Sequence, residues 1–409
     1  MDAYLGYLNS LINKNKQEYS QYSRIRWINT YTAIHAQEKR NFLLGDASDQ
    51  LLFKSTKPFY NHLSKGCQLC GQGLWSCLFI TGKCNARCFY CPARQDRDEI
   101  PESQGLLFPT PGSYADYVNR FGFKGVSFSG GEPLLFPKRV LAYLRAIRKN
   151  SDPEIYTWMY TNGLAANKTS FRELADAGLN EVRFDIGAAA YSLDKIQLAV
   201  ECIPVVSIEI PAVPEEKERI KTLLPQMVKA GVKNLNLHQL RLTHYNAPKL
   251  LQHNYTYLPA ERPIVLESEL AALEIIQHAR KLNLSLGINY CSFFFKHRFQ
   301  KAGFRRRIAG ELLADGDFLT ERGFIRQSNP DHTSYDAPMI RQCANGEKRC
   351  SDEGYHISRE AALKIRWKEK QTKTMYEQII RKEPRIIPGL PELFKVWQME
   401  YIEQGLRDY

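Results

Sequence analysis

The chain has 409 residues, of which 44% are hydrophobic and 24% charged, and its formal net charge is +12. These values allow one large domain with appendages and exclude a disordered chain. No run of about 18 apolar residues is present, which excludes a membrane span. The first twenty residues also lack the basic start and apolar block of a signal peptide. We therefore expect a cytoplasmic protein with no membrane contact.

The positive charge points to an acidic partner, such as RNA, an acidic protein or a phosphorylated substrate. The alternative is that Lys and Arg only solvate the surface. Net charge alone does not decide between the two.

Three regions follow one another along the chain. Residues 1–66 predict a mostly helical extension. Residues 67–291 contain seven β-rich runs, at 74–80, 124–130, 155–161, 181–187, 205–211, 234–240 and 284–291. Helical patterns lie between them, at 137–149, 170–178, 217–231 and 266–282.

This alternation predicts an α/β fold in which a parallel sheet, covered by helices, curls into a full or partial (β/α) barrel. Functional side chains of such barrels lie at the carboxyl ends of the strands. The spacing from Ser170 to Glu173 predicts a capping box at one helix start, and Pro225 predicts a kink in another helix.

Two segments interrupt or follow the barrel pattern. Residues 241–264 form a long connection without clear periodicity, which predicts a lid or binding loop, or else a surface excursion. Residues 292–409 predict a small C-terminal α+β region, with a hairpin at 316–327.

Cys84, Cys88 and Cys91 stand at the spacing C-x3-C-x2-C, directly after the first predicted strand. Thiolates two or three residues apart on a loop can reach neighbouring irons of an iron–sulfur cluster. Such clusters usually take four thiolates, so three would leave one iron open to another molecule. A structural zinc loop is the alternative.

With "SGGEP" at 129–133 after the second strand and "TNG" at 161–163 after the third, the triad resembles the radical S-adenosylmethionine (SAM) superfamily. Within that superfamily, the stretch "GVSFSGGEP" at 125–133 resembles pyruvate formate-lyase activating enzyme and its uncharacterised, partly archaeal relatives. The resemblance implies a [4Fe–4S] cluster whose open iron binds SAM. It implies reductive cleavage of SAM to a 5′-deoxyadenosyl radical, which abstracts hydrogen from a substrate. Flavodoxin or ferredoxin would supply the electron.

The resemblance also implies which residues contact SAM. Glu132 and the adjacent backbone would hold the methionine amino group, Asp185 the ribose, while Tyr90 and His238 would lie near the adenine. The full set of SAM-contact positions is Tyr90, Gly130, Gly131, Glu132, Thr161, Asn162, Asp185 and His238. No residue is assigned a catalytic role.

Other cysteines predict an auxiliary iron–sulfur or zinc site. Cys67 and Cys70 form a C-x2-C pair, and Cys291, Cys343 and Cys350 are candidate further ligands. Residues 66–73 precede the first strand, so they should lie at the far end of the barrel from Cys291 unless they fold back. The cysteine signature of family members that carry downstream auxiliary clusters is absent.

The stretch 291–307 is dense in basic and aromatic residues. It could contact phosphates and bases, or hold an acidic peptide or a nucleotide at the rim of the active site. Alternatively it is an amphipathic helix, in which Phe294, Phe295 and Phe299 pack on the barrel and the charges are solvated.

The sequence therefore predicts a radical SAM enzyme whose substrate is RNA or a protein or peptide. A small-molecule radical SAM enzyme is an alternative, and so is a glycyl-radical activase, although such activases are usually more compact. A metal-stabilised, non-catalytic RNA-binding protein is the alternative from another class.

Overall fold

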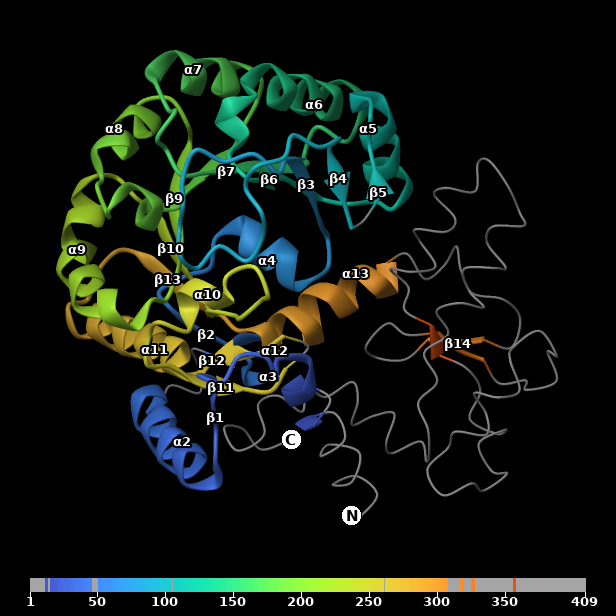
Figure 1. The fold of residues 1–409 in the computed structure, drawn as a ribbon. Coiled ribbons are helices and arrows are strands. Elements are labelled where there is room, and N and C mark those ends of the chain that lie inside the picture. The colour runs from blue at the N-terminus through green and yellow to red at the C-terminus, as the bar shows by residue number, and fades with distance from the viewer. Residues whose placement is uncertain are drawn as a thin grey trace.

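The computed structural model describes residues 12–13, 15–45, 51–104, 106–260, 262–307, 317–319, 325–327 and 356–357. Its centre is a ten-stranded sheet with the order β2-β13-β10-β9-β8-β7-β6-β3-β4-β5 (Figure 1). Seven strands run parallel: β3 (Trp75–Thr81), β6 (Gly125–Gly130), β7 (Tyr156–Thr161), β8 (Glu181–Phe184), β9 (Val205–Pro211), β10 (Asn234–His238) and β13 (Gly287–Cys291). All seven predicted runs are thus strands.

Antiparallel strands end the sheet on both sides. β2 (Lys57–Tyr60) pairs with β13, while β4 (Glu102–Ser103) and β5 (Leu106–Leu107) follow β3. The two outermost strands, β2 and β5, do not pair with each other, so the sheet is a partial barrel. The α/β prediction is confirmed.

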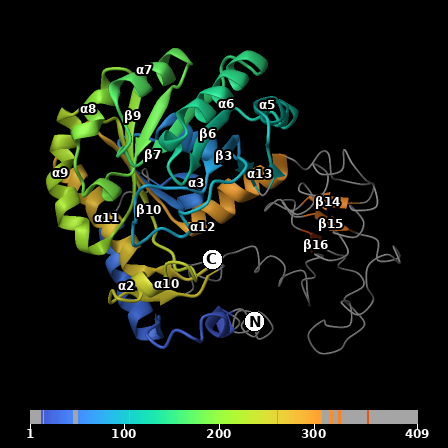
Figure 2. The ribbon, with the colours of Figure 1, turned by 45° about the horizontal axis from the view of Figure 1, so that its top comes forward.

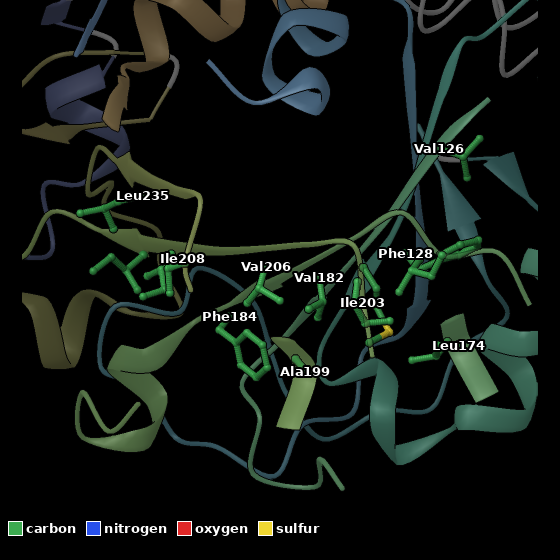
Figure 3. Close-up of a cluster of buried hydrophobic side chains, with 14 of the residues drawn as sticks. Val126, Phe128, Leu174, Val182, Phe184, Ala199, Ile203, Val206, Ile208 and Leu235 are labelled. Atoms are coloured by element: carbon green, nitrogen blue, oxygen red, sulfur yellow. The ribbon is translucent and has the colours of Figure 1, made fainter. Parts of the chain in front are cut away.

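Helices cover the outer face of the sheet (Figures 1 and 2). They are α5 (Pro111–Arg120), α6 (Pro137–Asn150), α7 (Lys168–Asp176), α8 (Asp194–Val200), α9 (Lys217–Lys229) and α11 (Leu266–Lys281). Alternate strand residues point toward them and form the apolar core, as Val126, Val182 and Val206 do (Figure 3). The intervening residues, such as Arg183 and Glu209, face the concave side, so the lumen is polar.

Local details differ from the sequence predictions. α7 begins earlier than expected, because the Asn167 side chain accepts the N–H of Ser170 and the Ser170 hydroxyl reaches back to Asn167. The capping box is therefore Asn167–Ser170 and not Ser170–Glu173. α9 continues as one helix through Pro225. β8 stops at Phe184 because Asp185 caps the turn η3 (Ile186–Ala189).

The described residues of the N-terminal region, 12–13, 15–45 and 51–66, combine helices with short strands that join the rest of the fold. α2 (Thr30–Leu44) packs on α11, and α3 (Leu52–Ser55) leads into β2, which joins the main sheet. β1 (Arg26–Trp27) pairs with β11 (Thr256–Leu258), which pairs with β12 (Ile264–Val265). The connection after β10 therefore has structure of its own, which also includes α10 (Ala247–Leu250).

α4 (Lys65–Gly71) lies on the concave side of the sheet, against β3, β6 and β7 (Figure 1). A Cβ on Gly66 would lie 2.3 Å from the Arg183 guanidinium, so glycine permits this close approach. The segment that carries Cys67 and Cys70 thus folds back into the lumen.

After β13 the chain forms a helical run of α12 (Phe293–Phe295), the wider turn η5 (Lys296–Lys301) and α13 (Ala302–Arg307). Phe304 stacks on Phe123, and Arg307 donates to the carbonyls of Phe121 and Gly122. The run therefore links the β13 end of the sheet to the β3–β6 connection near its other end.

The predicted hairpin exists as β14 (Asp317–Leu319) and β15 (Ile325–Gln327), and β16 (His356–Ile357) pairs with β15. Most of the predicted C-terminal region, including Cys343 and Cys350, lies outside the described residues. Within the described residues, every helix is too short or too polar to cross a bilayer.

Candidate active site

The loop between β3 and β4 carries Cys84, Cys88 and Cys91 at the carboxyl end of the sheet. The Cys84 sulfur accepts the N–H of Ala86 at 3.4 Å, and the Cys91 thiol donates to the Ala93 carbonyl at 3.4 Å. Burial raises the pKa of Cys88 to about 12, with help from the negative charge of Asp185. Without a bound cation, the loop therefore favours protonated thiols.

The two glycines of the "SGGEP" stretch support the start of this loop. The N–H of Gly131 donates to the Thr81 carbonyl at 2.7 Å, and the N–H of Glu132 donates to the Lys83 carbonyl at 2.8 Å. A Cβ on Gly131 would lie 2.1 Å from the Lys83 carbonyl oxygen, and one on Gly130 2.2 Å from that of Thr81. Glycine is thus required because the cysteine loop passes directly over this backbone.

Asp98 and Arg139 hold the other end of the cysteine loop. The Arg139 guanidinium donates to both Asp98 oxygens, at 2.6 and 3.0 Å, and also to the Ile80 carbonyl. The Thr81 hydroxyl donates to Asp98 at 3.0 Å. The bond to Arg139 lowers the pKa of Asp98. Nothing local marked Asp98 or Arg139 in the sequence, and both were missed.

Glu132 is fully buried and joins the ends of β6 and β7. Its carboxylate accepts from the N–H of Leu134 at 2.9 Å, the Thr161 hydroxyl at 2.7 Å and the N–H of Asn162 at 2.6 Å. Burial raises its pKa, and these three bonds oppose that rise. The expected contact between Glu132 and a methionine amino group stays a prediction.

Asn162 connects the end of β7 to the cysteine loop. Its side-chain amide donates to Asn85 Oδ1 at 2.8 Å and toward Cys84 Sγ at 3.5 Å. Thr161 and Asn162 are thereby placed beside both the glycine stretch and the triad, as the sequence predicts for neighbouring strand ends.

Asp185 and Tyr90 meet across the site. The Tyr90 hydroxyl donates to both Asp185 carboxylate oxygens, at 2.9 and 3.1 Å. Burial raises the pKa of Asp185 to about 6. Two residues expected to contact different parts of SAM are therefore neighbours, 95 positions apart in sequence.

The connection after β10 contacts the cysteine loop through hydrogen bonds and ring stacking. The Asn246 amide donates to the Tyr90 carbonyl at 3.1 Å, and the Thr243 hydroxyl donates to the Pro92 carbonyl at 3.1 Å. Phe89 stacks on His253, with ring centres 4.6 Å apart. The predicted lid or binding loop thus contacts the triad loop directly.

His238 is the end of β10 and belongs to a chain of charged groups on the concave side. Its Nε2 bonds to Glu209, and its Nδ1 lies 3.0 Å from Lys296 Nζ. Arg183 bonds Glu209 at 2.7 Å and Glu181 at 2.9 Å. Burial opposes ionisation of Glu209, but Arg183 and His238 hold its pKa well below the usual range. The expected place of His238 near the adenine stays a prediction.

Cys67, Cys70 and Cys291 lie around the same lumen. The Cys67 thiol donates to Asn236 at 3.4 Å, the Gln300 amide donates to Cys70 Sγ at 3.1 Å, and Lys57 Nζ donates to Cys291 Sγ at 2.7 Å. The fold-back of α4 removes the expected separation of this pair from Cys291. An auxiliary metal site here stays a prediction.

Among the described residues, no group of three Cys, His, Asp or Glu side chains lies close enough together to hold a metal ion. This also applies to the three cysteines of the triad as they are placed here. The chemistry of the triad nevertheless fits a [4Fe–4S] cluster, because its three donors are sulfurs on one loop. The described cysteines form no disulfide. The loop start is fixed by Gly131 and Glu132 and its end by Arg139, so its thiols are kept at the strand ends.

The match to the radical SAM superfamily model covers residues 78–227. A putative glycyl-radical enzyme activating enzyme from Methanocaldococcus jannaschii is 28% identical over 280 residues, which is 65% of this chain and 73% of that protein. A probable GTP 3′,8-cyclase from the same organism is 35% identical over 112 residues, 26% of this chain and 34% of the cyclase.

Among solved structures, Streptococcus suis SuiB bound to S-adenosylmethionine is similar with a TM-score of 0.41 and 13% identity, over 54% of this chain and 50% of that one. The family match spans the triad, the glycine stretch, Asn162 and Asp185. Residues 78–227 therefore form a radical SAM domain, the kind of domain that uses a [4Fe–4S] cluster and S-adenosylmethionine as its cofactors.

Proposed function

We propose that Cys84, Cys88 and Cys91 hold the cluster, and that the enzyme acts on a protein or peptide. Bound there, the cluster and SAM supply reductive cleavage of SAM and hydrogen-atom abstraction from the substrate. The observation that carries the proposal is the contact of Gly131 and Glu132 with the start of the cysteine loop. It joins two motifs 40 residues apart into one site.

The chain's own residues would bind and orient the cofactor. The two Asp185 oxygens share the single proton that the Tyr90 hydroxyl donates, and the hydroxyls of a ribose are donors of the same type. Glu132 would act mainly by fixing Thr161 and Asn162, because its oxygens already accept three bonds. Asn162 would orient the loop at Cys84.

Support for a protein or peptide substrate comes from the Methanocaldococcus relative, whose name describes an enzyme that activates another protein. The partial barrel also leaves its two edge strands, β2 and β5, unpaired with each other. RNA remains the competing class from the +12 charge. A flavodoxin or ferredoxin is the proposed electron donor.

Hydrogen transfer identifies the substrate class directly. The reduced, reconstituted enzyme is incubated with SAM and with fractions of a perdeuterated extract of its host. We expect deuterium in 5′-deoxyadenosine with the protein fraction, abolished by protease treatment and unaffected by ribonuclease. Transfer that follows the RNA or small-molecule fraction instead would contradict the proposed substrate class.

A further inference from the structure

β5 is the last strand of the sheet on one side (Figure 1), and two apolar side chains beside it are open to solvent. Phe79 of β3 is 48% exposed and Leu107 of β5 is 53% exposed. Both lie in register with Glu102 of β4, so the three side chains project from the same face of the sheet. We call these three residues the edge surface. Because about half of each apolar side chain is exposed, the edge surface has room for a further side chain.

The edge surface belongs to the concave side of the sheet. Trp75 lies four residues before Phe79 on β3, so both side chains point to the same face. Trp75 stacks on Trp158 of β7, and the Trp158 ring lies close to Gly66 of α4, the helix inside the lumen. The same face therefore lines the lumen at its centre and carries the edge surface at its rim.

The edge surface is continuous with the expected cofactor position. Ser129 lies opposite Phe79, and Gly130 lies opposite Thr81, in the register of β6 with β3. Gly130 is one of the expected SAM-contact positions, and the Thr81 carbonyl accepts the N–H of Gly131 at 2.7 Å. A molecule bound along this face would thus lie against both the cofactor position and the edge of the sheet.

The backbone of Leu107 offers a donor and an acceptor at this edge. The Phe108 N–H donates to the Pro101 carbonyl at 2.7 Å, so Pro101 and Phe108 are a hydrogen-bonded pair. Such pairs alternate with non-hydrogen-bonded pairs along antiparallel strands, which makes Glu102 and Leu107 a non-hydrogen-bonded pair. The N–H and C=O of Leu107 therefore point away from β4, and neither bonds another described residue. An edge of this kind can pair with a further strand.

These features together fit an extended polypeptide. A free N–H and C=O on a strand edge recognise the backbone of another strand, and a nucleic acid or a lipid has no such backbone. The exposed Phe79 and Leu107 fit an apolar side chain beside that backbone. Glu102 lies between them, so an acidic side chain at the same place would be repelled.

We propose that β5 pairs with an extended segment of the polypeptide substrate, and that Phe79 and Leu107 contact an apolar side chain of that segment. The inference rests on the proposed function for the class of substrate. The added strand would lie four strand spacings from β6, which is about 19 Å across the sheet. An extended chain covers about 3.3 Å per residue, so the segment would lie roughly six residues from the residue that reacts. It therefore anchors the substrate and does not itself react.

The test measures deuterium transfer into 5′-deoxyadenosine at increasing concentrations of the perdeuterated protein fraction, with full-length holoenzyme and SAM. Leu107→Pro removes the outward N–H and keeps an apolar side chain, whereas Leu107→Lys keeps the N–H and removes the apolar side chain. We expect the half-saturating concentration to rise about fivefold in Leu107→Pro and about tenfold in Leu107→Lys, with the rate at saturation retained. Leu282→Lys changes a leucine that is 45% exposed at the end of α11, and it should behave like the wild type.

Each result of these kinetics bears on the inference. Unchanged half-saturating concentrations in both Leu107 variants would overturn it and leave the proposed function standing, because transfer itself persists. A change in the saturating rate alone would also overturn it, since Leu107 would then act on the reaction and not on binding. Absence of transfer from the protein fraction to the wild type would contradict the proposed substrate class, and the inference with it.

Stability and oligomeric state test for other occupants of the edge. Without substrate, an unbonded N–H and an exposed side chain contribute little, so both Leu107 variants should keep the thermal midpoint of the wild type. A marked fall in both variants would show that another segment of this chain already pairs with β5. A wild-type dimer that Leu107→Pro converts to a monomer in sedimentation would show that a second copy takes the edge. Either result would overturn the inference.

Discussion

At the scale of single residues, Gly131 sets how closely the cysteine loop approaches the end of β6. Gly131→Ala would place a Cβ 2.1 Å from the Lys83 carbonyl oxygen, which is backbone and cannot rotate away. We expect a displaced loop, less iron per chain after reconstitution, and SAM cleavage reduced about 100-fold, because displacements of about 1 Å in a reacting site cost that much.

Gly112→Ala is the matched control for this substitution. Gly112 lies in the first turn of α5, and a Cβ there meets no atom within 4 Å. Its iron content and SAM cleavage should equal those of the wild type. Equal iron and activity in Gly131→Ala would show that the glycine contact does not position the cluster.

At the scale of elements, Asn246 connects the segment after β10 to the cysteine loop. Asn246→Ala removes the donor to the Tyr90 carbonyl and the donor to the Arg241 carbonyl. Losing about 1 kcal/mol of hydrogen bonding should speed amide exchange of residues 84–92 several-fold. Hydrogen-exchange mass spectrometry measures this rate.

Gln252→Ala serves as the control for Asn246→Ala, because it removes an exposed bond to the Pro248 carbonyl within the same segment. Exchange of residues 84–92 should not change in that variant. An equal increase of the exchange rate in both variants would mean that the whole segment becomes more mobile. Asn246 would then not stabilise the cysteine loop specifically.

The docking of α2 depends on Glu274 of α11, which bonds Lys39 of α2 at 2.7 Å and also bonds Lys217 of α9. Burial opposes ionisation of Glu274, but these lysines lower its pKa from 4.5 to about 2. Because the pKa of Glu274 is lower in the folded state than in the unfolded state, its carboxylate stabilises the fold at pH values above 4.5. This contribution disappears as the pH falls from 4.5 toward 2.

Glu274→Gln should therefore lower the free energy of unfolding at pH 7 by about 1–2 kcal/mol, after allowance for solvent screening. The difference from the wild type should shrink between pH 4.5 and 2. Urea titrations across this range measure it. A difference that is constant with pH would show that packing, and not charge, is what Glu274 contributes.

At the scale of the whole molecule, the sequence predicts those features that follow a repeating hydrophobic pattern or a fixed residue spacing. Each β-rich run from 74–80 to 284–291 contains a strand, as predicted. Alternating apolar residues indicate a strand with one buried face. The triad was identified because its spacing follows from cluster chemistry, and the glycine stretch was identified by its resemblance to the family's Gly-Gly-Glu-Pro element. The short strands β4 and β5 and the helix α5 were missed, since they lie in a segment with little periodicity.

Contacts between distant segments could not be predicted. The place of α4 inside the lumen follows from packing of Gly66 against Arg183, which no local pattern encodes. Lys57 seemed an ordinary charged residue until β2 paired with β13 beside Cys291. The stretch 291–307 was expected to be either a solvated amphipathic helix or a substrate rim. Phe294 and Phe295 are buried as the first predicts, but Lys296 turns inward to His238.

The measurement that tests the central claim most directly is dithionite-dependent formation of 5′-deoxyadenosine from SAM by the anaerobically reconstituted enzyme. We expect product from the wild type and from Cys202→Ala, a cysteine just after α8 that is remote in sequence from the triad. We expect none from Cys88→Ala with its fold intact. Product from Cys88→Ala at the wild-type rate, or none from a wild type loaded with iron, would contradict the claim that the triad holds the cluster that cleaves SAM.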